Sequence, residues 1–252
     1  MKTIFIGVPE FGAIVLEKLI KSGHKPFLVI TAPDKPVGRK QTLTPPPVKV
    51  LAENYHISVV QPEKIGNCKS EIKNLKPDLI IVAAYGQLIL KEILDIPTYG
   101  CLNVHPSLLP KYRGASPIQS AILNGDEKTG VTIMRLSEKL DSGPILANNE
   151  WQITNRITYK ELHDKLAELG AELLIKTIQK LLAGKINPQP QDDSKTTYTK
   201  ILTKEDGKID WQKSAVEIER QIRALNPEPD SYCQWQMANN KLQISKFKLQ
   251  TD

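Results

Sequence analysis

The sequence predicts an α/β protein built on a Rossmann-like, mostly parallel sheet. Short apolar runs lie at residues 3–7, 27–31, 79–84 and 101–104. Stretches with helical spacing of apolar residues separate these runs, and this alternation is typical of parallel strands joined by crossover helices. The 252 residues, 40% of them hydrophobic and 25% charged, suffice for a substantial core.

Helices are expected between these strands. Residues 11–19 and 47–52 have helical apolar spacing, and the second stretch begins on a proline, which suits a first helical turn. Another helix is expected to open at Pro117. The strongest helix signal follows Thr158, which together with Glu161 has the form of a capping box. Leucine and isoleucine recur beyond it, so one face of this helix is expected to pack on the sheet.

Residues 187–199 are rich in proline, glutamine, aspartate and serine, which indicates a linker. This boundary divides the chain into a domain of residues 1–186 and a C-terminal segment of residues 200–252. The segment is expected to contain a helix at 215–225 and a β-hairpin that turns at 239–240. Because about fifty residues hold too little apolar material for a secure core, the segment is expected to lean on the main domain.

The strand that ends at His105 carries the most informative residues of the chain. Side chains on a strand alternate between its two faces, so Asn103 and His105 are expected to project to the same side, while Val104 points into the core. One face of the strand therefore presents an amide and an imidazole. Ligands of α/β sheets bind at the carboxyl ends of such strands.

The loop after this strand, residues 106–110, has a proline at each end. Proline fixes φ and lacks a backbone donor, so the strand is expected to end abruptly and the loop to be rigid. Farther along, Asp141 lies in a turn sequence after the apolar run at 131–136. Its carboxylate could reach the same edge of the sheet. Asp141 could equally serve only to form that turn, which is a common role for aspartate.

These motifs resemble those of the folate-dependent formyltransferases, and within that family most closely the members that act on methionyl-tRNA. The resemblance covers nearly the whole chain, at residues 5–11, 33–39, 103–117, 141–146 and 204–229. It implies an enzyme that transfers the formyl group of 10-formyltetrahydrofolate to the amino group of methionyl initiator tRNA, for the initiation of translation. No metal is implied. The C-terminal segment is shorter than in full-length members, so it is expected to form an incomplete β-barrel.

The resemblance also implies roles for individual residues. Those that match the family's catalytic residues are Asn103, His105 and Asp141. The loop that lies against the folate in the family matches Ser107, Leu108, Leu109 and Pro110. The loop that contacts the acceptor end of initiator tRNA corresponds here to a basic stretch that includes Arg39 and Lys40. Lys111 and Arg113 could meet the folate tail or a phosphate, or could face solvent.

The three catalytic candidates suit formyl transfer to an amine. The amine becomes acidic once it attacks and must lose a proton, and imidazole titrates near neutral pH, so His105 could move that proton. The carboxylate of Asp141 would favour the imidazolium and orient the ring. The amide of Asn103 could donate a hydrogen bond to the developing oxyanion.

Several alternatives remain open from the sequence. The same chemistry could act on an amino sugar nucleotide or on a purine precursor. A non-catalytic RNA-binding module would follow if the three catalytic candidates did not converge, and the basic loop could be only a solvated surface. The turn at residues 7–12 lacks the glycine fingerprint of dinucleotide-binding folds, which disfavours an NAD-dependent dehydrogenase.

Net charge and apolar content limit the kinds of partner that are expected. The 34 Lys and Arg against 28 Asp and Glu give a net charge of +6, which mildly favours an anionic partner such as RNA. No apolar stretch approaches the roughly 18 residues that span a bilayer, and the N-terminus does not have the form of a signal peptide. We therefore expect a cytoplasmic monomer without a membrane partner. The three cysteines are widely separated, which suggests neither a disulfide framework nor a zinc site.

Overall fold

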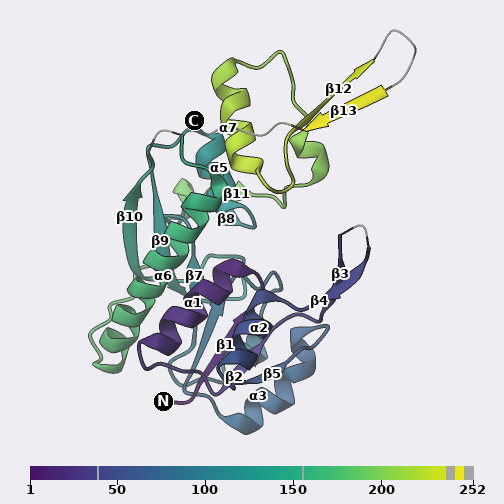
Figure 1. Ribbon diagram of the computed structural model, residues 1–252. Coiled ribbons are helices and arrows are strands. Elements are labelled where there is room, and N and C mark those ends of the chain that lie inside the picture. Colours follow the sequence, from purple (N-terminus) through teal and green to yellow (C-terminus); the bar gives the residue numbers. More distant parts are fainter. Residues whose placement is uncertain (39, 155, 237–241, 247–252) are drawn as a thin grey trace.

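A seven-stranded sheet forms the centre of the protein, seen in a computed structural model that describes residues 1–38, 40–154, 156–236 and 242–246 (Figure 1). The strands lie in the order β10-β9-β7-β6-β1-β2-β5. Five of them are parallel, whereas β9 runs antiparallel to β7 and β10 antiparallel to β9. Their bounds are β1 Thr3–Gly7, β2 Leu28–Ile30, β5 Ser58–Val60, β6 Leu79–Ala83, β7 Cys101–His105, β9 Lys128–Arg135 and β10 Ile145–Gln152. The predicted mostly parallel α/β fold is confirmed.

Two apolar cores cover the two faces of this sheet. The larger core lies beneath α1 (Glu10–Lys21), α2 (Pro47–Asn54) and α6 (Tyr159–Leu182), and it receives Phe5 from the sheet. The smaller core lies beneath the 3-10 helix η1 (Ile65–Cys68), α3 (Lys69–Leu75) and α4 (Lys91–Leu94), and it receives residues 4 and 6. Alternate residues of one strand thus feed opposite cores, as the two-residue period of a buried strand requires.

Helix α6 begins at the capping box that the sequence predicts. The backbone N–H of Thr158 donates to the Glu161 carboxylate over 2.8 Å, and the Thr158 hydroxyl accepts from the Glu161 N–H over 3.4 Å. Farther along the helix, a Cβ on Gly170 would lie 2.6 Å from a Val104 methyl. This glycine lets α6 approach β7 closely, and so the helix fixes the strand that carries the candidate site. Of the described helices, none is both long and apolar enough to span a bilayer.

The remaining elements extend from this sheet. The β3–β4 hairpin, consisting of β3 (Lys35–Val37) and β4 (Thr42–Thr44), follows β2. The predicted helix that opens at Pro117 is α5 (Pro117–Leu123). Short strands β8 (Arg113–Gly114) and β11 (Tyr198–Thr199) pair in parallel. The 3-10 helix η2 (Asp193–Lys195) lies just before β11.

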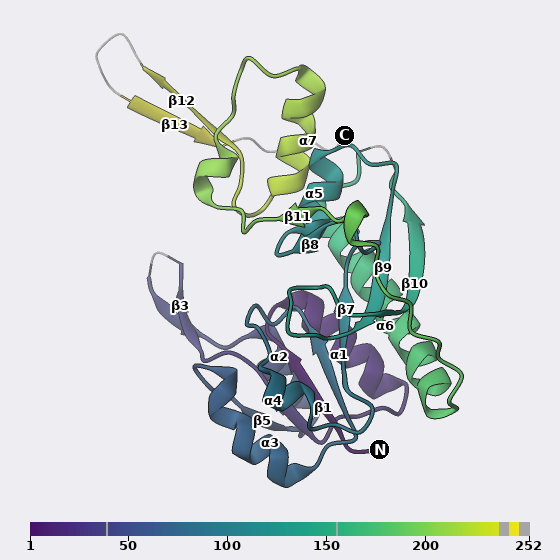
Figure 2. The ribbon, with the colours of Figure 1, turned by 180° about the vertical axis from the view of Figure 1, so that it is seen from behind.

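The C-terminal part leans on the main body through α7 (Ala215–Leu225), which packs against α5 and matches the predicted helix. It also contains η3 (Lys204–Gly207) and the antiparallel hairpin of β12 (Tyr232–Gln236) and β13 (Leu242–Lys246). The predicted turn at 239–240 lies outside the described residues. Both the β12–β13 and the β3–β4 hairpins project to the same side of the molecule, as the two opposite views show (Figures 1 and 2).

Candidate active site

Strand β7 separates its side chains between the two cores. Leu102 and Val104 belong to the core beneath α6, and Cys101 belongs to the core beneath α3. By alternation, Asn103 and His105 lie on the α3 face, as the sequence predicts. Asn103 is half-buried, whereas His105 is only 4% exposed. An imidazole so far from water must be held by specific partners.

The two ring nitrogens of His105 have different partners. Nε2 lies 2.9 Å from the backbone oxygen of Tyr112. Because a carbonyl oxygen can only accept, Nε2 must carry a hydrogen. Nδ1 lies 3.8 Å from Oδ2 of Asp141, too far for a hydrogen bond but within ion-pair distance. The neutral ring therefore keeps its lone pair on Nδ1, and the nitrogen that can take up a proton is the one that faces a carboxylate.

Asp141 is held in a tight turn after β9. Its φ of +46° is in the left-handed region, which few residues other than glycine adopt. The Gly114 N–H donates to Oδ2 over 2.8 Å. The side-chain amide of Gln191 donates to the backbone oxygens of Asp141 and Gly143, both over 2.8 Å. The aspartate thus forms a turn and also reaches the imidazole, so the two roles considered from the sequence coexist.

The loop after β7 is fixed from beneath by Thr132 of β9, a residue that pairs with His105 in the sheet. The Thr132 hydroxyl donates to the backbone oxygen of Ser107 over 2.7 Å and accepts from the Leu109 N–H over 3.1 Å. The Ser107 hydroxyl donates to the backbone oxygen of Lys111 over 2.6 Å. These bonds add to the rigidity expected from the prolines, and two of the three involve β9.

The predicted folate loop does not present all four side chains outward. Ser107 is fully buried and Leu109 is 5% exposed, whereas Leu108 and Pro110 are half-buried. Leu108 rests on Gly130, where a Cβ would lie 2.6 Å from its methyl. Any ligand on this loop would therefore contact Leu108, Pro110 and the backbone.

The structure gives different settings to the basic residues that the sequence singles out. Lys40 is exposed beyond the end of β3, and Arg39 lies outside the described residues. Lys111 pairs with Asp126 over 2.7 Å. Arg113, considered above as a folate, phosphate or solvent contact, is only 2% exposed and donates to Gln191 and Asp193. A buried guanidinium with these partners is a structural group, so the earlier interpretation of Arg113 is wrong.

Asp34 anchors the β3–β4 hairpin at its base. Its carboxylate accepts from the Gln61 amide over 2.7 Å, and each of its oxygens accepts from the Lys49 ammonium over 2.9 Å. The hydrogen bond from Gln61, followed by that from Lys49, holds the pKa of Asp34 below its usual range. All strand residues of the hairpin beyond this base are exposed.

Two residues of the site were missed by sequence reasoning. Thr132 lies inside an apolar run, where its hydroxyl gives no local sign of a partner. Gln191 lies in the predicted linker, which indicated no fixed structure. Both act through contacts with segments that are 23 or more residues away in sequence. Only the pairing of β7 with β9 could have pointed to Thr132, since that register places it opposite His105.

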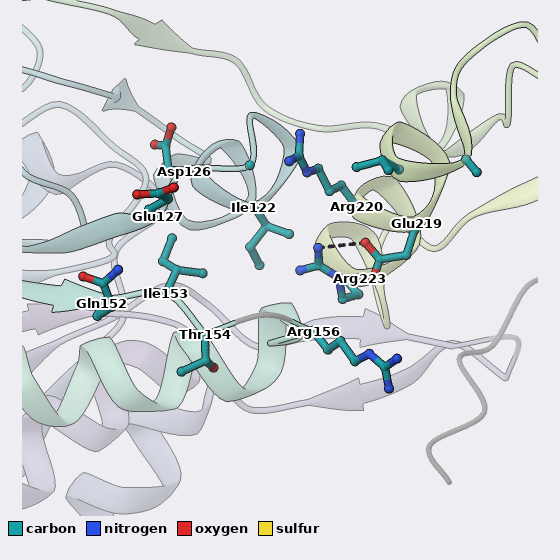
Figure 3. A pocket seen from close by; sticks show the side chains of 13 residues that line it. Ile122, Asp126, Glu127, Gln152, Ile153, Thr154, Arg156, Glu219, Arg220 and Arg223 are labelled. Carbon is teal, nitrogen blue, oxygen red and sulfur yellow. Dashed lines mark hydrogen bonds and ion pairs between the residues drawn. The ribbon is translucent and has the colours of Figure 1, made fainter.

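A cavity of about 980 Å³ lies elsewhere, between the ends of α5 and β10 and the first turns of α7 (Figure 3). Its lining includes Arg156, Arg220 and the Arg223–Glu219 ion pair, and it contains none of the predicted site residues. The Arg220 guanidinium lies against Gly125, where a Cβ would be 2.0 Å from Cζ. The cavity is therefore part of the seam through which α7 packs on the main body.

Comparison with known proteins places this chain in a family. Residues 1–178 match the family model for formyl transferases, and residues 201–252 match that for the formyl transferase C-terminal domain. The chain belongs to the formyl transferase family. This confirms the resemblance seen in the sequence, and it gives the Asn103, His105 and Asp141 arrangement a family context.

Curated relatives of this chain are named methionyl-tRNA formyltransferase. The relative from Geobacillus sp. (strain WCH70) is 50% identical over 92% of this chain and 74% of its own length. That from Halalkalibacterium halodurans is 48% identical over 93% and 75%, and that from Citrifermentans bemidjiense is 45% identical over 100% and 78%. The chain therefore spans about three quarters of the length of these relatives.

Solved structures of other proteins share the fold. An N-formyltransferase from Helicobacter canadensis, in complex with folinic acid and dTDP-3-aminofucose, has a TM-score of 0.71 at 24% identity, over 92% of this chain and 83% of that one. HypX from Aquifex aeolicus, in complex with tetrahydrofolic acid, has a TM-score of 0.69 at 18% identity, over 92% and 36%. At these identities the similarity is one of fold.

Proposed function

We propose that this protein transfers the formyl group of 10-formyltetrahydrofolate to the amino group of methionine on initiator tRNA, at the start of protein synthesis. Relatives at 45 to 50% identity named methionyl-tRNA formyltransferase support this acceptor. Solved structures of the same fold with folinic or tetrahydrofolic acid bound support a folate-type donor. The observation that carries the chemistry is the buried His105 ring, whose Nδ1 faces Asp141 at 3.8 Å.

The proposed reaction forms one bond and breaks one. The amine of methionine attacks the formyl carbon, and the side-chain amide of Asn103 donates a hydrogen bond to the oxyanion that develops. The amine nitrogen becomes acidic on attack and loses its proton to Nδ1 of His105. The bond between the formyl carbon and N10 of the folate then breaks, and the proton on Nδ1 passes to N10. No metal takes part in these steps.

Two neighbouring groups prepare His105 for this proton transfer. The Tyr112 carbonyl accepts from Nε2–H and so keeps the lone pair on Nδ1. The Asp141 carboxylate stabilises the imidazolium once Nδ1 is protonated, and the Gly114 N–H holds that carboxylate in place. Two of the three predicted catalytic residues thus meet directly, and Asn103 lies two residues before His105 on the same strand face.

The same proposal assigns the binding surfaces. Folate is placed on the loop of Ser107, Leu108, Leu109 and Pro110, with contacts from Leu108, Pro110 and the backbone because the other two side chains are buried. The acceptor end of the tRNA is placed against the β3–β4 hairpin, through Arg39 and Lys40.

We also propose the organisation of the chain and its setting. Residues 1–186 form the catalytic domain, residues 187–199 connect it to the rest, and residues 200–252 form a C-terminal segment that helps to hold tRNA. The separate family matches on either side of residues 179–200 support this division. The protein acts as a cytoplasmic monomer, a setting consistent with its tRNA acceptor.

An acceptor assay tests the proposed function. Purified protein is mixed with 10-formyltetrahydrofolate and, separately, methionylated initiator tRNA, an amino sugar nucleotide and an aminated ribonucleotide. Formyl should appear on the methionyl-tRNA alone. Methionyl-tRNA whose amine has been acetylated is the control and should gain no formyl. Product on the sugar nucleotide or the ribonucleotide in place of methionyl-tRNA would overturn the acceptor.

A further inference from the structure

Residues 187–199, here called the strap, are bonded to the catalytic domain along their length. Gln189 exchanges two backbone hydrogen bonds with Ile145 at the start of β10, each over 2.8 Å. Near the other end, β11 pairs with β8, and the Ser116 N–H donates to the Thr199 hydroxyl over 3.0 Å. A segment whose composition indicated a linker therefore lies fixed against the loops that hold the candidate site.

The strap is bonded to residues 112–114, two of which hold the catalytic pair. On one side of this short stretch, the Tyr112 carbonyl accepts from His105 and the Gly114 N–H donates to Asp141. On the other side, the N–H groups of Tyr112 and Arg113 donate to the hydroxyl and the carbonyl of Thr197, over 2.8 and 2.9 Å. Residues 112–114 thus lie between the strap and both members of the pair.

Gln191 of the strap joins the two catalytic loops to each other. Its side-chain oxygen accepts from Nε and Nη2 of Arg113, over 3.0 and 2.8 Å. Its side-chain nitrogen donates to the backbone oxygens of Asp141 and Gly143 in the other loop. The oxygen and the nitrogen of this one amide are thus both hydrogen-bonded. Arg113, which donates to the oxygen, is 2% exposed and cannot move freely.

We propose that Gln191 is a positioning residue for formyl transfer, which sets the geometry between His105 and Asp141 by tying their two loops together. This inference rests on the proposed function. Asp141 adopts a φ of +46°, a conformation that aspartate tolerates better than most residues but that still costs free energy. The two hydrogen bonds from Gln191 help to hold the turn in this conformation. Without them the turn relaxes, and the carboxylate leaves its place beside Nδ1.

The test compares two glutamines of the same strap. Gln191→Asn keeps the amide but shortens the side chain by one methylene, so it cannot bond both loops at once. Gln189→Asn makes the same change on an exposed side chain that, among the residues the structure describes, donates only to Asn187 within the strap. We expect Q191N to lower kcat on methionyl-tRNA by about 10- to 100-fold, the cost of a misplacement on the order of 1 Å, with KM for both substrates within about threefold. Q189N should match the wild type.

A further readout distinguishes positioning from a general loss of structure. In a double-mutant cycle with Asp141→Asn, Q191N should add little further loss of kcat, since it acts through that aspartate. Losses that multiply in the double variant would overturn the proposal.

A second variant covers the case in which Q191N does not fold. Gln191→Glu keeps the length of the side chain and its pairing with Arg113 but loses the donor to both carbonyls, and it should show the same fall in kcat. Wild-type kcat in either folded variant overturns the proposal. So does failure of both variants to fold while Q189N folds, because Gln191 would then be needed for folding.

The results for the wild type distinguish a failure of this inference from a failure of the proposed function. If the wild type formylates a different amine, the acceptor is wrong, and the ratio of variant to wild type on that amine still tests Gln191. If it formylates none of the amines, the chemical shifts of the His105 ring at one pH supply the comparison, because they report the position of the nearby carboxylate. Ring shifts unchanged by Q191N would then overturn the role of Gln191.

Discussion

The loop after β7 and the β3–β4 hairpin both follow parallel strands of one sheet, yet they are built in opposite ways. Beneath the loop, buried polar groups such as Ser107 and Thr132 bond to its backbone. In the hairpin, Val37 and Leu43 are 56% and 65% exposed, and the Asp34 anchor lies at its base. Chemistry needs atoms at fixed positions, whereas contact with a phosphate backbone needs charge that can reach it. The contrast fits the proposed roles, catalysis at the loop after β7 and tRNA contact at the hairpin.

Removing the imidazole of His105 should lower the rate of catalysis most severely. His105→Ala eliminates the proton acceptor, and loss of general acid–base catalysis costs about 10²- to 10⁴-fold in kcat. KM for methionyl-tRNA should change little, because the hairpin is untouched. Initial rates at saturating donor measure both quantities. His24→Ala, a change in a loop after α1, is the control and should keep full activity. A loss below tenfold in H105A would remove His105 from the mechanism.

The amide of Asn103 should have the next largest effect. Asn103→Ala removes the proposed oxyanion donor, and loss of one such donor costs about 10²- to 10³-fold in kcat. Asn103→Asp keeps the shape but places an anion beside the oxyanion, so it should be at least as impaired. Rates of formylmethionyl-tRNA formation provide the measurement. If N103A retained more than a tenth of wild-type kcat, the oxyanion would have to be stabilised by another group.

Local patterns account for the part of the site that the sequence could predict. The two-residue period of a strand placed Asn103 and His105 on one face, and two prolines marked the rigid loop after them. The capping box at Thr158 likewise located the start of α6. The role of Asp141 came from the resemblance to the family, and its place beside His105 is now seen in the structure.

The parts that could not be predicted depend on contacts between distant segments. From the sequence, Arg113 would be expected to be an exposed cation. It can be buried because Gln191 and Asp193 accept hydrogen bonds from its guanidinium. Those partners come from a segment whose composition indicated a linker. The edge strand β10 was also missed. Polar residues in its exposed half obscure the alternation of apolar and polar side chains that indicates a strand. No local pattern encodes such pairings.

Thr132 offers a way to loosen the catalytic loop without touching a reacting group. Thr132→Val keeps the shape of the side chain but leaves the Leu109 N–H and the Ser107 carbonyl without their partner. A buried donor left unsatisfied costs about 1–3 kcal/mol, so unfolding in urea should occur at lower concentration. KM for the folate should rise as well. Thr129→Val, at a buried site on the same strand, is the control, since its hydroxyl bonds to none of the described groups. Equal stability of T132V and wild type would contradict this account.

A substitution in the β3–β4 hairpin should weaken tRNA binding and leave catalysis unchanged. Lys40→Ala removes an exposed charge, so KM for methionyl-tRNA should rise with little change in kcat. Loss of one phosphate contact should also reduce the slope of log affinity against log salt by about 1. Filter binding at several salt concentrations measures this slope. Lys180→Ala, on the last turn of α6 on the opposite side of the molecule, is the control (Figure 1). An unchanged slope in K40A would remove Lys40 from the tRNA surface.

The anchor at the base of the hairpin should have the smallest effect, and one that depends on pH. The pKa of Asp34 is lowered by the Gln61 amide first and the Lys49 ammonium second. A carboxyl whose folded pKa is depressed contributes stability above its unfolded pKa, about 3.9, and that contribution is lost as the pH falls through the folded pKa. Asp34→Asn cannot ionise, so it should be less stable than wild type at pH 7, and this difference should shrink below about pH 4.

Urea denaturation of wild type and D34N across this pH range measures the difference. The same substitution made in a Lys49→Met background should have less effect at pH 7, because one of the two partners of the carboxylate is already absent. A difference in stability that stays constant with pH would mean that the ionised carboxylate is not what fixes the hairpin. The base of the hairpin would then resemble the catalytic loop, because both would be anchored by neutral contacts, in the hairpin by bonds such as that from Gln61 to the Ala32 carbonyl.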